Sequence, residues 1–161
     1  MEQRYHFCFD EGSCEETRRR VSKAGLPARA FHSDLEQAER EDILRGFKNK
    51  QVTILIGTDV LSRGIDVEGI SLVINYDVPP DPEDYVHRVG RTARAETTGT
   101  AVTFINERDQ RKFQSIERLI GDVIVKLPVP EELGPGPAYN PASAKNHRPK
   151  SFHRRKVKGK R

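Results

Sequence analysis

Short apolar runs alternate with amphipathic segments from about residue 4 to residue 125. Runs rich in Val, Ile, Phe and Tyr predict strands, because β-branched and aromatic side chains fit a half-buried pleated surface. The predicted strands cover residues 4–9, 28–31, 52–57, 70–76, 100–105 and 123–125. Alternation of strands and helices over about 120 residues predicts an α/β fold, in which helices cover both faces of a parallel sheet to make three layers.

The helices are predicted from apolar residues at spacings of three and four. They cover residues 13–23, 34–48 and 107–120, and a further helix begins at Asp81, which is followed by a proline suited to the first helical turn. Ser, Asp and Asn cap helices because their side chains accept hydrogen bonds from the first backbone amides. The predicted caps of the three bounded helices are Ser13, Asp34 and Asn106. Asp34 is followed three residues later by Gln37, the spacing of a capping box.

The chain has 161 residues, enough for one α/β domain with a hydrophobic core. Proline and glycine become frequent from Pro128, and residues 134–161 contain nine Lys or Arg and no Asp or Glu. The other 19 bases face 24 acids, so the preceding part carries a net charge of −5. We therefore predict a folded domain over residues 1–130 and a disordered basic tail over residues 131–161. The tail either contacts nucleic acid or only increases solubility.

No apolar run approaches the roughly 18 residues of a membrane-spanning helix, and the first residues lack the pattern of a signal peptide. The two cysteines, Cys8 and Cys14, form no Cys-x-x-Cys pair and have no histidines at zinc-ligand spacing. Free thiols are typical of reducing compartments. The sequence therefore predicts a cytoplasmic protein with no membrane contact and no metal site of its own.

The first candidate functional segment is residues 58–66, which read Thr-Asp-Val-Leu-Ser-Arg-Gly-Ile-Asp. It follows the apolar run 52–57 directly, so polar side chains stand at the carboxyl end of a buried strand. Open α/β sheets bind their ligands at that edge. The segment is therefore predicted to be a binding loop.

The second candidate is residues 87–94, which read His-Arg-Val-Gly-Arg-Thr-Ala-Arg. On a helix, Arg91 and Arg94 share a face, and His87 lies one turn before Arg91. Two guanidinium groups on one edge suit a triphosphate or a nucleic-acid backbone, because each presents a fixed fork of donors. The alternative is a solvated basic helix face.

A third candidate is the pair Gln37 and Arg40, one turn apart near the start of the helix predicted from residue 34. Exposed backbone amides and a guanidinium at a helix N-terminus suit a phosphate group. The alternative is a capping glutamine beside an ordinary surface arginine.

Together, segments 58–66 and 87–94, about 20 residues apart, resemble the two main signatures of the C-terminal RecA-like domain of DEAD-box RNA helicases. The similarity extends from about Phe7 to Pro130. It looks closest to RhlE-like members, which share the stretches H-S-D-L-E-Q and V-P-E-E-L-G present in this chain. The resemblance implies a RecA-like (P-loop NTPase-like) fold, ATP as the nucleotide and RNA bound through its backbone without sequence selectivity.

The resemblance also implies a role for each matching residue. Arg91 and Arg94 would act as arginine fingers on the γ-phosphate of ATP. Asp66 would bind the ribose, and Gly64 would let the backbone approach the nucleotide. His87 and Arg88 would couple the domain to the acidic motif of a partner domain and to neighbouring loops. The residues implied to lie along the RNA phosphodiester track, or to brace it, are Gln37, Arg40, Thr58, Asp59 and Arg63.

Two features depart from the family pattern. The chain has no G-x-x-x-x-G-K-S/T phosphate loop and no Asp-Glu-Ala-Asp motif, and the similar stretch 81–84 stands at a helix start. Phosphoryl transfer then lacks its phosphate cradle and Mg²⁺ ligands. We therefore expect a missing N-terminal RecA-like domain to hold Mg²⁺ and most of the ATP, and the chain alone not to hydrolyse ATP. The second departure is residues 4–7, Arg-Tyr-His-Phe, where the family usually has an aliphatic strand.

The main hypothesis is the C-terminal half of an ATP-dependent RNA helicase. One alternative is a non-catalytic RNA-binding module, or a truncated helicase fragment without turnover of its own. Another is a different superfamily-2 motor, such as a DEAH-type helicase, in which Gln typically replaces His at the position of His87.

Overall fold

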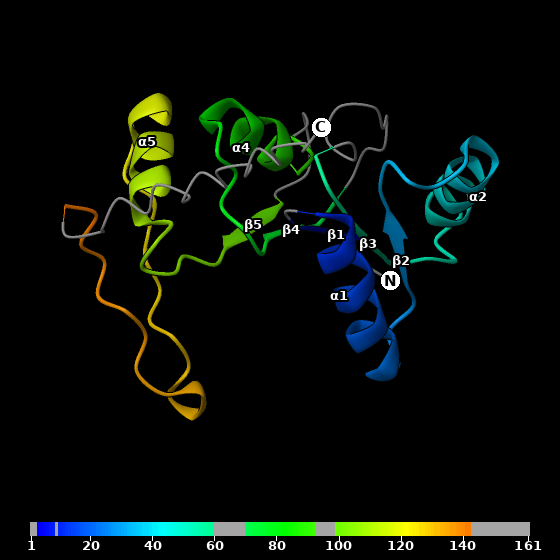
Figure 1. Cartoon of the computed structure of the whole chain (residues 1–161), viewed down its shortest axis with the longest axis horizontal. Helices are drawn as coiled ribbons and strands as arrows, with labels where there is room; N and C mark the ends of the chain where they lie inside the picture. Colours follow the sequence, from blue (N-terminus) through cyan, green and yellow to red (C-terminus); the bar gives the residue numbers. More distant parts are fainter. Residues whose placement is uncertain (1–2, 9, 60–69, 93–98, 143–161) are drawn as a thin grey trace, which may run out of the picture.

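The computed structural model describes residues 3–8, 10–59, 70–92 and 99–142. The strands are β1 (Arg4–Phe7), β2 (Ala28–Phe31), β3 (Ile54–Gly57), β4 (Leu72–Asn75) and β5 (Thr100–Thr103). The helices are α1 (Glu11–Lys23), α2 (Gln37–Lys48), α4 (Pro82–Val89) and α5 (Gln110–Ile120), and a 3₁₀ turn covers Glu131–Leu133. Strands and helices alternate along the described chain, except that β4 is the next described element after β3 (Figure 1).

All strand pairs are parallel, and the strand order across the sheet is β2-β3-β1-β4-β5. From the central strand β1 the chain passes to β2 at one edge of the sheet. The later strands β4 and β5 lie on the other side of β1. Because crossover connections between parallel strands are right-handed, the two directions of travel put helices on opposite faces. Figure 1 shows α1 on one side of the sheet and α2, α4 and α5 on the other. The predicted three-layer α/β architecture is confirmed.

Alternate residues of the strands fill two separate cores, because successive side chains of a strand point to opposite faces. On the face covered by α2, Tyr5 and Phe7 of β1 pack with Leu55, Val73 and Phe47. The rings of Tyr5 and Phe47 stack with their centres 5.4 Å apart. Full burial of side chains of this size contributes about 1.5–3 kcal/mol each. Two aromatic residues thus fill the central strand, where the family usually has aliphatic ones.

The face covered by α1 holds a core of smaller residues, which are Cys8, Cys14, Ala28, Ala30, Ile54 and Ile56. The two cysteines are buried free thiols and pack as small hydrophobic side chains. A third cluster, with Tyr85, Phe113 and Ile116 at its centre, joins α4 to α5. Each helix layer therefore has its own apolar contact with the body of the domain.

The first two helices begin at different residues from those predicted. Asp10 caps α1, and its Oδ1 accepts a hydrogen bond from the Ser13 backbone nitrogen at 2.8 Å, so Ser13 lies inside the first turn. The capping box of α2 uses Glu36 instead of Asp34, and Glu39 Oε2 accepts from the Glu36 backbone nitrogen at 3.1 Å. Several side chains with capping ability lie within a few residues here. The residue at which the preceding strand and turn end decides which of these side chains caps the helix.

The last helix also begins later than predicted, at Gln110. Asn106 Oδ1 accepts from the Asp109 backbone nitrogen at 3.2 Å and so closes a turn ahead of the helix. Asn side chains stabilise such turns as readily as helix starts. The predicted cap of α4 is confirmed, because Asp81 Oδ1 accepts from the Glu83 backbone nitrogen at 3.0 Å.

The strand predicted at residues 123–125 is wrong. Val123 and Val125 are 76% and 81% exposed, and this segment has no strand assignment. Glu117 of α5 holds it instead, because Oε1 accepts from the Ile124 backbone nitrogen at 3.0 Å and also pairs with the Lys126 ammonium. The segment therefore returns beside α5 (Figure 1). β-branched residues form a strand only where a partner strand and a packing surface are available.

Residues 137–142 also lie against α5. The Gln110 side chain donates to the Ala138 backbone oxygen at 2.8 Å and accepts from the Asn140 backbone nitrogen at 2.6 Å. Tyr139 donates its hydroxyl to Glu117 Oε2 at 2.9 Å. The domain boundary at residue 130 stays a prediction, and residues 143–161 lie outside the described residues.

None of the described helices combines the length and apolar character needed to cross a membrane.

Candidate functional site

Polar residues gather where the parallel strands end. β3 leads into Thr58 and Asp59, and β4 ends at Asn75. The register places Phe7, the last residue of β1, beside Gly57 on one side and Asn75 on the other. The ends of β1, β3 and β4 are therefore neighbours along the edge where open α/β sheets bind ligands.

Arg88 of α4 lies at the centre of this edge and is only 1% exposed. Its Nε donates to Asp59 Oδ1 at 2.6 Å and its Nη2 donates to Asp59 Oδ2 at 3.0 Å, which makes a two-point ion pair. Its Nη1 donates to the Asp77 backbone oxygen at 3.0 Å and approaches Asn75 Oδ1 at 3.5 Å. The guanidinium carbon lies 5.0 Å from the centre of the Phe7 ring.

These contacts join the ends of three strands to one helix. A buried guanidinium costs several kcal/mol unless it is paired and its donors are used. Here the carboxylate of Asp59, a carbonyl oxygen and the face of an aromatic ring supply those partners. Asn75 extends the network to the next strand, because its Nδ2 donates to Thr103 Oγ1 at 3.2 Å. The network fixes α4 relative to the loop that follows β3.

Arg88 faces inward because of its position on α4. The buried residues of this helix are Asp84, Tyr85 and Arg88, and because Asp84 and Tyr85 precede Arg88 by four and three residues they form one stripe. His87, the next residue round the helix, is exposed. The contacts of Arg88 are with neighbouring loops of its own domain. Coupling of His87 and Arg88 to a partner domain stays a prediction.

The prediction that Arg91 lies on the helix is wrong, because α4 ends at Val89 with Gly90 as its C-cap. Arg91 lies in the turn that follows and is half-buried. Its Nε donates to the His87 backbone oxygen at 3.3 Å, which sets the direction of the guanidinium. Burial raises the pKa of the Tyr5 hydroxyl, and the nearby charge of Arg91 opposes that rise. The second predicted arginine finger, Arg94, lies outside the described residues.

Most of the predicted loop after β3 is also outside the described residues, including Arg63, Gly64 and Asp66. The described start of that loop is well placed for a ligand. Thr58 is 7% exposed, and its hydroxyl has no hydrogen-bond partner among the described residues. An unpaired buried hydroxyl costs about 1–3 kcal/mol, so the described residues leave this group unsatisfied.

Gln37 and Arg40 lie in the first turn of α2, close to the same edge because β2 runs parallel to β3. Gln37 is exposed, and its Nε2 donates to Glu41 at 2.9 Å. Arg40 Nη2 donates to the Ser33 backbone oxygen at 2.5 Å, which ties α2 to the end of β2. Their contact with RNA stays a prediction.

Two residues of the Arg88 network, Phe7 and Asn75, were not identified from the sequence. A signal for Asn75 was present, since a polar amide ends an otherwise apolar run and is 0% exposed in the fold. Buried polar side chains are almost always hydrogen-bonded, so such a residue indicates a buried network. No group of three or more His, Cys, Asp or Glu side chains that could hold a metal ion occurs in the described part of the chain.

The family model described as "Helicase conserved C-terminal domain" matches residues 3–96. The chain is 46% identical over 121 residues to a probable ATP-dependent RNA helicase of Methanocaldococcus jannaschii, covering 75% of this chain and 33% of that protein. It is 40% identical over 141 residues to the ATP-dependent RNA helicase DBP2 of Candida glabrata, covering 83% and 26%. The chain thus spans between a quarter and a third of the length of these relatives.

Solved structures show the same relationship. A DEAD box protein from the hyperthermophile Methanococcus jannaschii superposes with a TM-score of 0.74 at 44% identity, covering 78% of this chain and 35% of that one. The Escherichia coli DEAD-box protein SrmB, bound to regulator of ribonuclease activity A, gives 0.77 at 30% identity, covering 86% and 81%. The RecA-like fold is thereby confirmed, while the RhlE-like placement stays a prediction. With a matched family model, close relatives and a shared fold, this chain belongs to the helicase conserved C-terminal domain family, in its DEAD-box branch.

Proposed function

We propose that the chain works as the C-terminal half of an ATP-dependent RNA helicase. It would complete an ATP site carried mainly by an N-terminal RecA-like domain and would form part of an RNA track. The observation that carries this proposal is the Arg88 network, which holds α4, with His87 and Arg91, against the loop after β3. One buried ion pair thus joins the helix that precedes Arg91 to the described start of the loop, at Thr58 and Asp59.

At the nucleotide, Arg91 and Arg94 stabilise negative charge on the γ-phosphate, Asp66 contacts the ribose, and Gly64 allows close approach of the backbone. Arginine fingers accelerate phosphoryl transfer by roughly 10³–10⁵. The hydrogen bond from Arg91 to the His87 backbone supports this role, because a guanidinium with a fixed direction loses less entropy when it meets a phosphate.

Mg²⁺, when bound, neutralises charge on the β- and γ-phosphate oxygens. Among the described residues no cluster of carboxylates or histidines fits this ion. Mg²⁺ would be held by the N-terminal domain, together with the water-positioning acid. The contribution of this chain is positive charge at the γ-phosphate.

At the RNA, Gln37, Arg40, Thr58 and Arg63 lie along the phosphodiester track, and Asp59 braces it through Arg88. Contacts to phosphates and sugars give little sequence selectivity and a strong dependence on salt. A related protein, Dbp5 of Saccharomyces cerevisiae, has been solved bound to RNA and ADP BeF₃, with a TM-score of 0.71 at 29% identity over 76% of this chain and 33% of that one. That complex supports RNA as the polymer recognised by this fold.

The test of the ATP role is Arg91→Ala in this chain joined to the N-terminal helicase domain of the Methanocaldococcus jannaschii relative. RNA-stimulated ATP hydrolysis should fall by about 10³-fold or more, whereas RNA binding without nucleotide should be retained. Arg108→Ala, which removes an exposed arginine outside the site, is the matched control and should leave turnover unchanged. Wild-type turnover in Arg91→Ala would refute the assignment.

A second candidate function is RNA binding without turnover, favoured by the nine bases of the C-terminal tail. Deletion of residues 143–161 should weaken RNA binding by the chain alone mainly at low salt, because released counterions drive such binding. A salt-independent loss would indicate a folded contact instead. If adding the N-terminal domain produces no ATP hydrolysis while the chain alone holds RNA, the binding module is the better description.

A further inference from the structure

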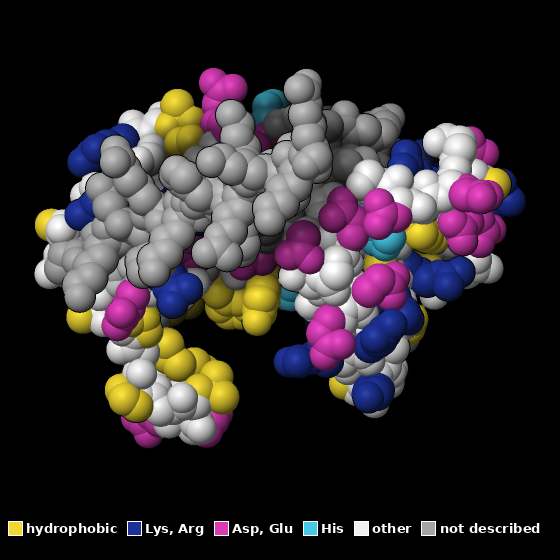
Figure 2. Space-filling view, in the orientation of Figure 1, with side chains coloured by type: hydrophobic (Ala, Val, Ile, Leu, Met, Phe, Trp, Pro, Cys, Tyr) yellow, Lys and Arg dark blue, Asp and Glu magenta, His cyan; other side chains and the backbone are white. Residues whose placement is uncertain are grey.

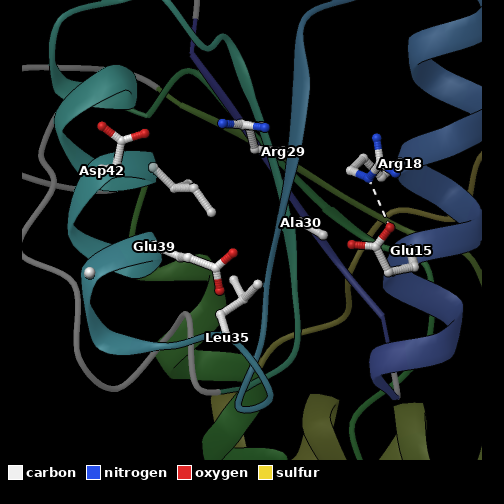
Figure 3. Close-up of a pocket in the computed structure, with 9 residues that line it drawn as sticks. Glu15, Arg18, Arg29, Ala30, Leu35, Glu39 and Asp42 are labelled. Atoms are coloured by element: carbon white, nitrogen blue, oxygen red, sulfur yellow. Dashed lines mark hydrogen bonds and ion pairs between the residues drawn. The ribbon is translucent and has the colours of Figure 1, made fainter.

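A trough of about 600 Å³ runs along the outer edge of the sheet, between α1 and α2. Figure 3 shows β2 crossing its floor, with side chains of α2 on one wall and of α1 on the other. Protein pockets that bind ligands have volumes of roughly 300–1,000 Å³. The trough lies beside the strand-end site described above and shares no residue with it.

The floor of the trough is an unpaired strand edge. β2 is the last strand of the sheet and pairs only with β3. The Ile54 backbone nitrogen donates to the Pro27 oxygen at 3.2 Å, and the register pairs Ala28 with Ile54. In a parallel pair with this register, Arg29 directs its backbone groups toward β3, whereas Ala28 and Ala30 direct theirs outward. Ala30 lines the trough and is 4% exposed, because its side chain packs into the core on the α1 face.

Sheet edges are normally protected against pairing with other chains by short length, charge or a covering element. β2 is only four residues long and carries the exposed Arg29, so part of this protection is present. The helices on either side stop a flat sheet edge from approaching. A single extended segment, however, has the width of the missing strand.

The two walls differ in chemistry. On the α2 side, Leu35, Ala38 and Ile43 form an apolar surface, and the exposed carboxylates of Glu39 and Asp42 stand above it. Asp42 makes no hydrogen bond or ion pair with any described residue. Figure 2 shows acidic side chains gathered over this helix.

On the α1 side, Glu15 and Arg18 neutralise each other in an ion pair of 2.9 Å. Arg29 of β2 also lines the trough, and its side chain turns toward Asp42 (Figure 3). With Glu15 and Arg18 cancelling each other, Glu39 and Asp42 against Arg29 leave an excess of one negative charge on the α2 side. A phosphate backbone is repelled by that wall, whereas Lys or Arg side chains are attracted to it.

We propose that the trough binds an extended segment of a partner protein, which adds a strand beside β2. Alternate side chains of this segment face the α2 wall, and in order they are basic, aliphatic and basic. Strand addition supplies backbone hydrogen bonds, and pockets for alternate side chains supply selectivity. The aliphatic side chain rests on Leu35 and Ile43, and the basic ones meet Asp42 and Glu39. The positions between them face the neutral ion pair of α1 and carry small polar residues.

This surface is independent of the proposed helicase site. Gln37 and Arg40 lie on a different face of α2 from Ala38, Glu39 and Asp42, since 100° separates successive residues of a helix. A partner segment in the trough therefore leaves the proposed RNA residues uncovered. The interaction fits recruitment of the domain to a partner while RNA is bound.

The probe is a fluorescein-labelled peptide, Thr-Lys-Thr-Val-Thr-Lys-Thr, titrated with the full chain and followed by fluorescence polarisation. Asp42→Lys should weaken binding by about tenfold or more, because it replaces the attracting charge by a repelling one. Glu41→Lys, which changes the neighbouring acid outside the trough, is the matched control and should have a small effect. Replacing both lysines of the peptide by Glu should abolish binding.

Strand addition is tested by Ala30→Pro. Proline removes the outward backbone N–H without removing a hydrogen bond to β3, so the thermal midpoint should hold while binding falls. If this variant does not fold, N-methylation of the peptide tests strand addition instead. Methylating the alternate amides that face β2 should block binding, whereas methylating the amides between them should be tolerated.

Strand addition into the trough is overturned by any of three results. One is binding that Asp42→Lys leaves unchanged and that the backbone test also leaves unchanged. The backbone test is Ala30→Pro or, if that variant does not fold, N-methylation of the peptide in both registers. Another is displacement of the peptide by poly(U) RNA, which would assign the surface to nucleic acid. The third is the absence of binding up to about 1 mM peptide, which is weaker than peptide recognition by strand addition.

Discussion

Removing the charge of Asp59 should destabilise the domain strongly, although this residue is partly exposed. The Asp59 side chain is 33% exposed, but the side chain of Arg88, whose charge it neutralises, is only 2% exposed. Asp59→Asn keeps the shape of the side chain and leaves a buried, uncompensated positive charge. Losing one partner of a buried ion pair costs about 3–5 kcal/mol. The lower end applies here, about 3 kcal/mol, because solvent reaches the carboxylate and the Asp77 carbonyl remains as an acceptor.

Urea unfolding followed by circular dichroism measures this loss directly. For a small domain the free energy of unfolding falls by about 1–3 kcal/mol for each molar of urea. A loss of about 3 kcal/mol therefore lowers the unfolding midpoint by about 1–3 M. The slope should stay the same, because the folded state buries the same surface in both proteins.

A double-mutant cycle with Arg88→Met separates the ion pair from other effects. Replacing both charges removes the buried guanidinium, so the double mutant should be more stable than the sum of the single losses by about 2 kcal/mol. Additive losses would mean that Asp59 and Arg88 do not stabilise each other. A midpoint for Asp59→Asn within about 0.3 M of the parent would refute the central place given to this pair.

Two further predictions concern single side chains. Tyr5→Phe should stabilise the domain by up to about 1 kcal/mol in the same urea assay, because the buried Tyr5 hydroxyl has no hydrogen-bond partner among the described residues; a loss of stability would reveal such a partner. Burial raises the pKa of Glu117, but hydrogen bonds from Lys126, Tyr139 and the Ile124 backbone outweigh it and hold the pKa below the usual 4.5. Ionised Glu117 therefore stabilises the fold above about pH 4.5, and this contribution is lost as the pH falls through its folded pKa. Glu117→Gln should lower the thermal midpoint near pH 7 and flatten its decline toward pH 3, and an unchanged pH profile would contradict this reasoning.

The sequence predicts most of the fold because periodicity reports burial directly. The runs at 52–57 and 70–76 contain the buried strands β3 and β4, and α2 follows its apolar spacing. The failures have one cause. Helix caps and the segment 123–125 depend on which of several competing local partners is closest in space. That choice is made by tertiary contacts such as those of Glu117, which local patterns do not contain.

The candidate site was predicted in part for a related reason. The motifs place Thr58, Asp59 and Arg88 at one edge, and the structure brings Asp59 and Arg88 into contact. The inward direction of Arg88 could be predicted from the helix pattern, since Tyr85 is a core residue one turn earlier. Its ion-pair partner, Asp59, could not be predicted from the sequence. It lies 29 residues away in the chain, and only the parallel order of β3, β1 and β4 brings it close.

Arg88 and Arg91 belong to the same motif but have different roles in the structure. Arg88 is buried, fully paired and part of the fold, so its removal should change stability before it changes chemistry. Arg91 is half-buried, and its Nε donates to the backbone of α4, so its removal should destabilise the fold less than removal of Arg88. A loss of ATP hydrolysis is therefore interpretable at Arg91 alone. At Arg88 the same loss must first be separated from unfolding, which the urea midpoints of Arg88→Met and Asp59→Asn measure.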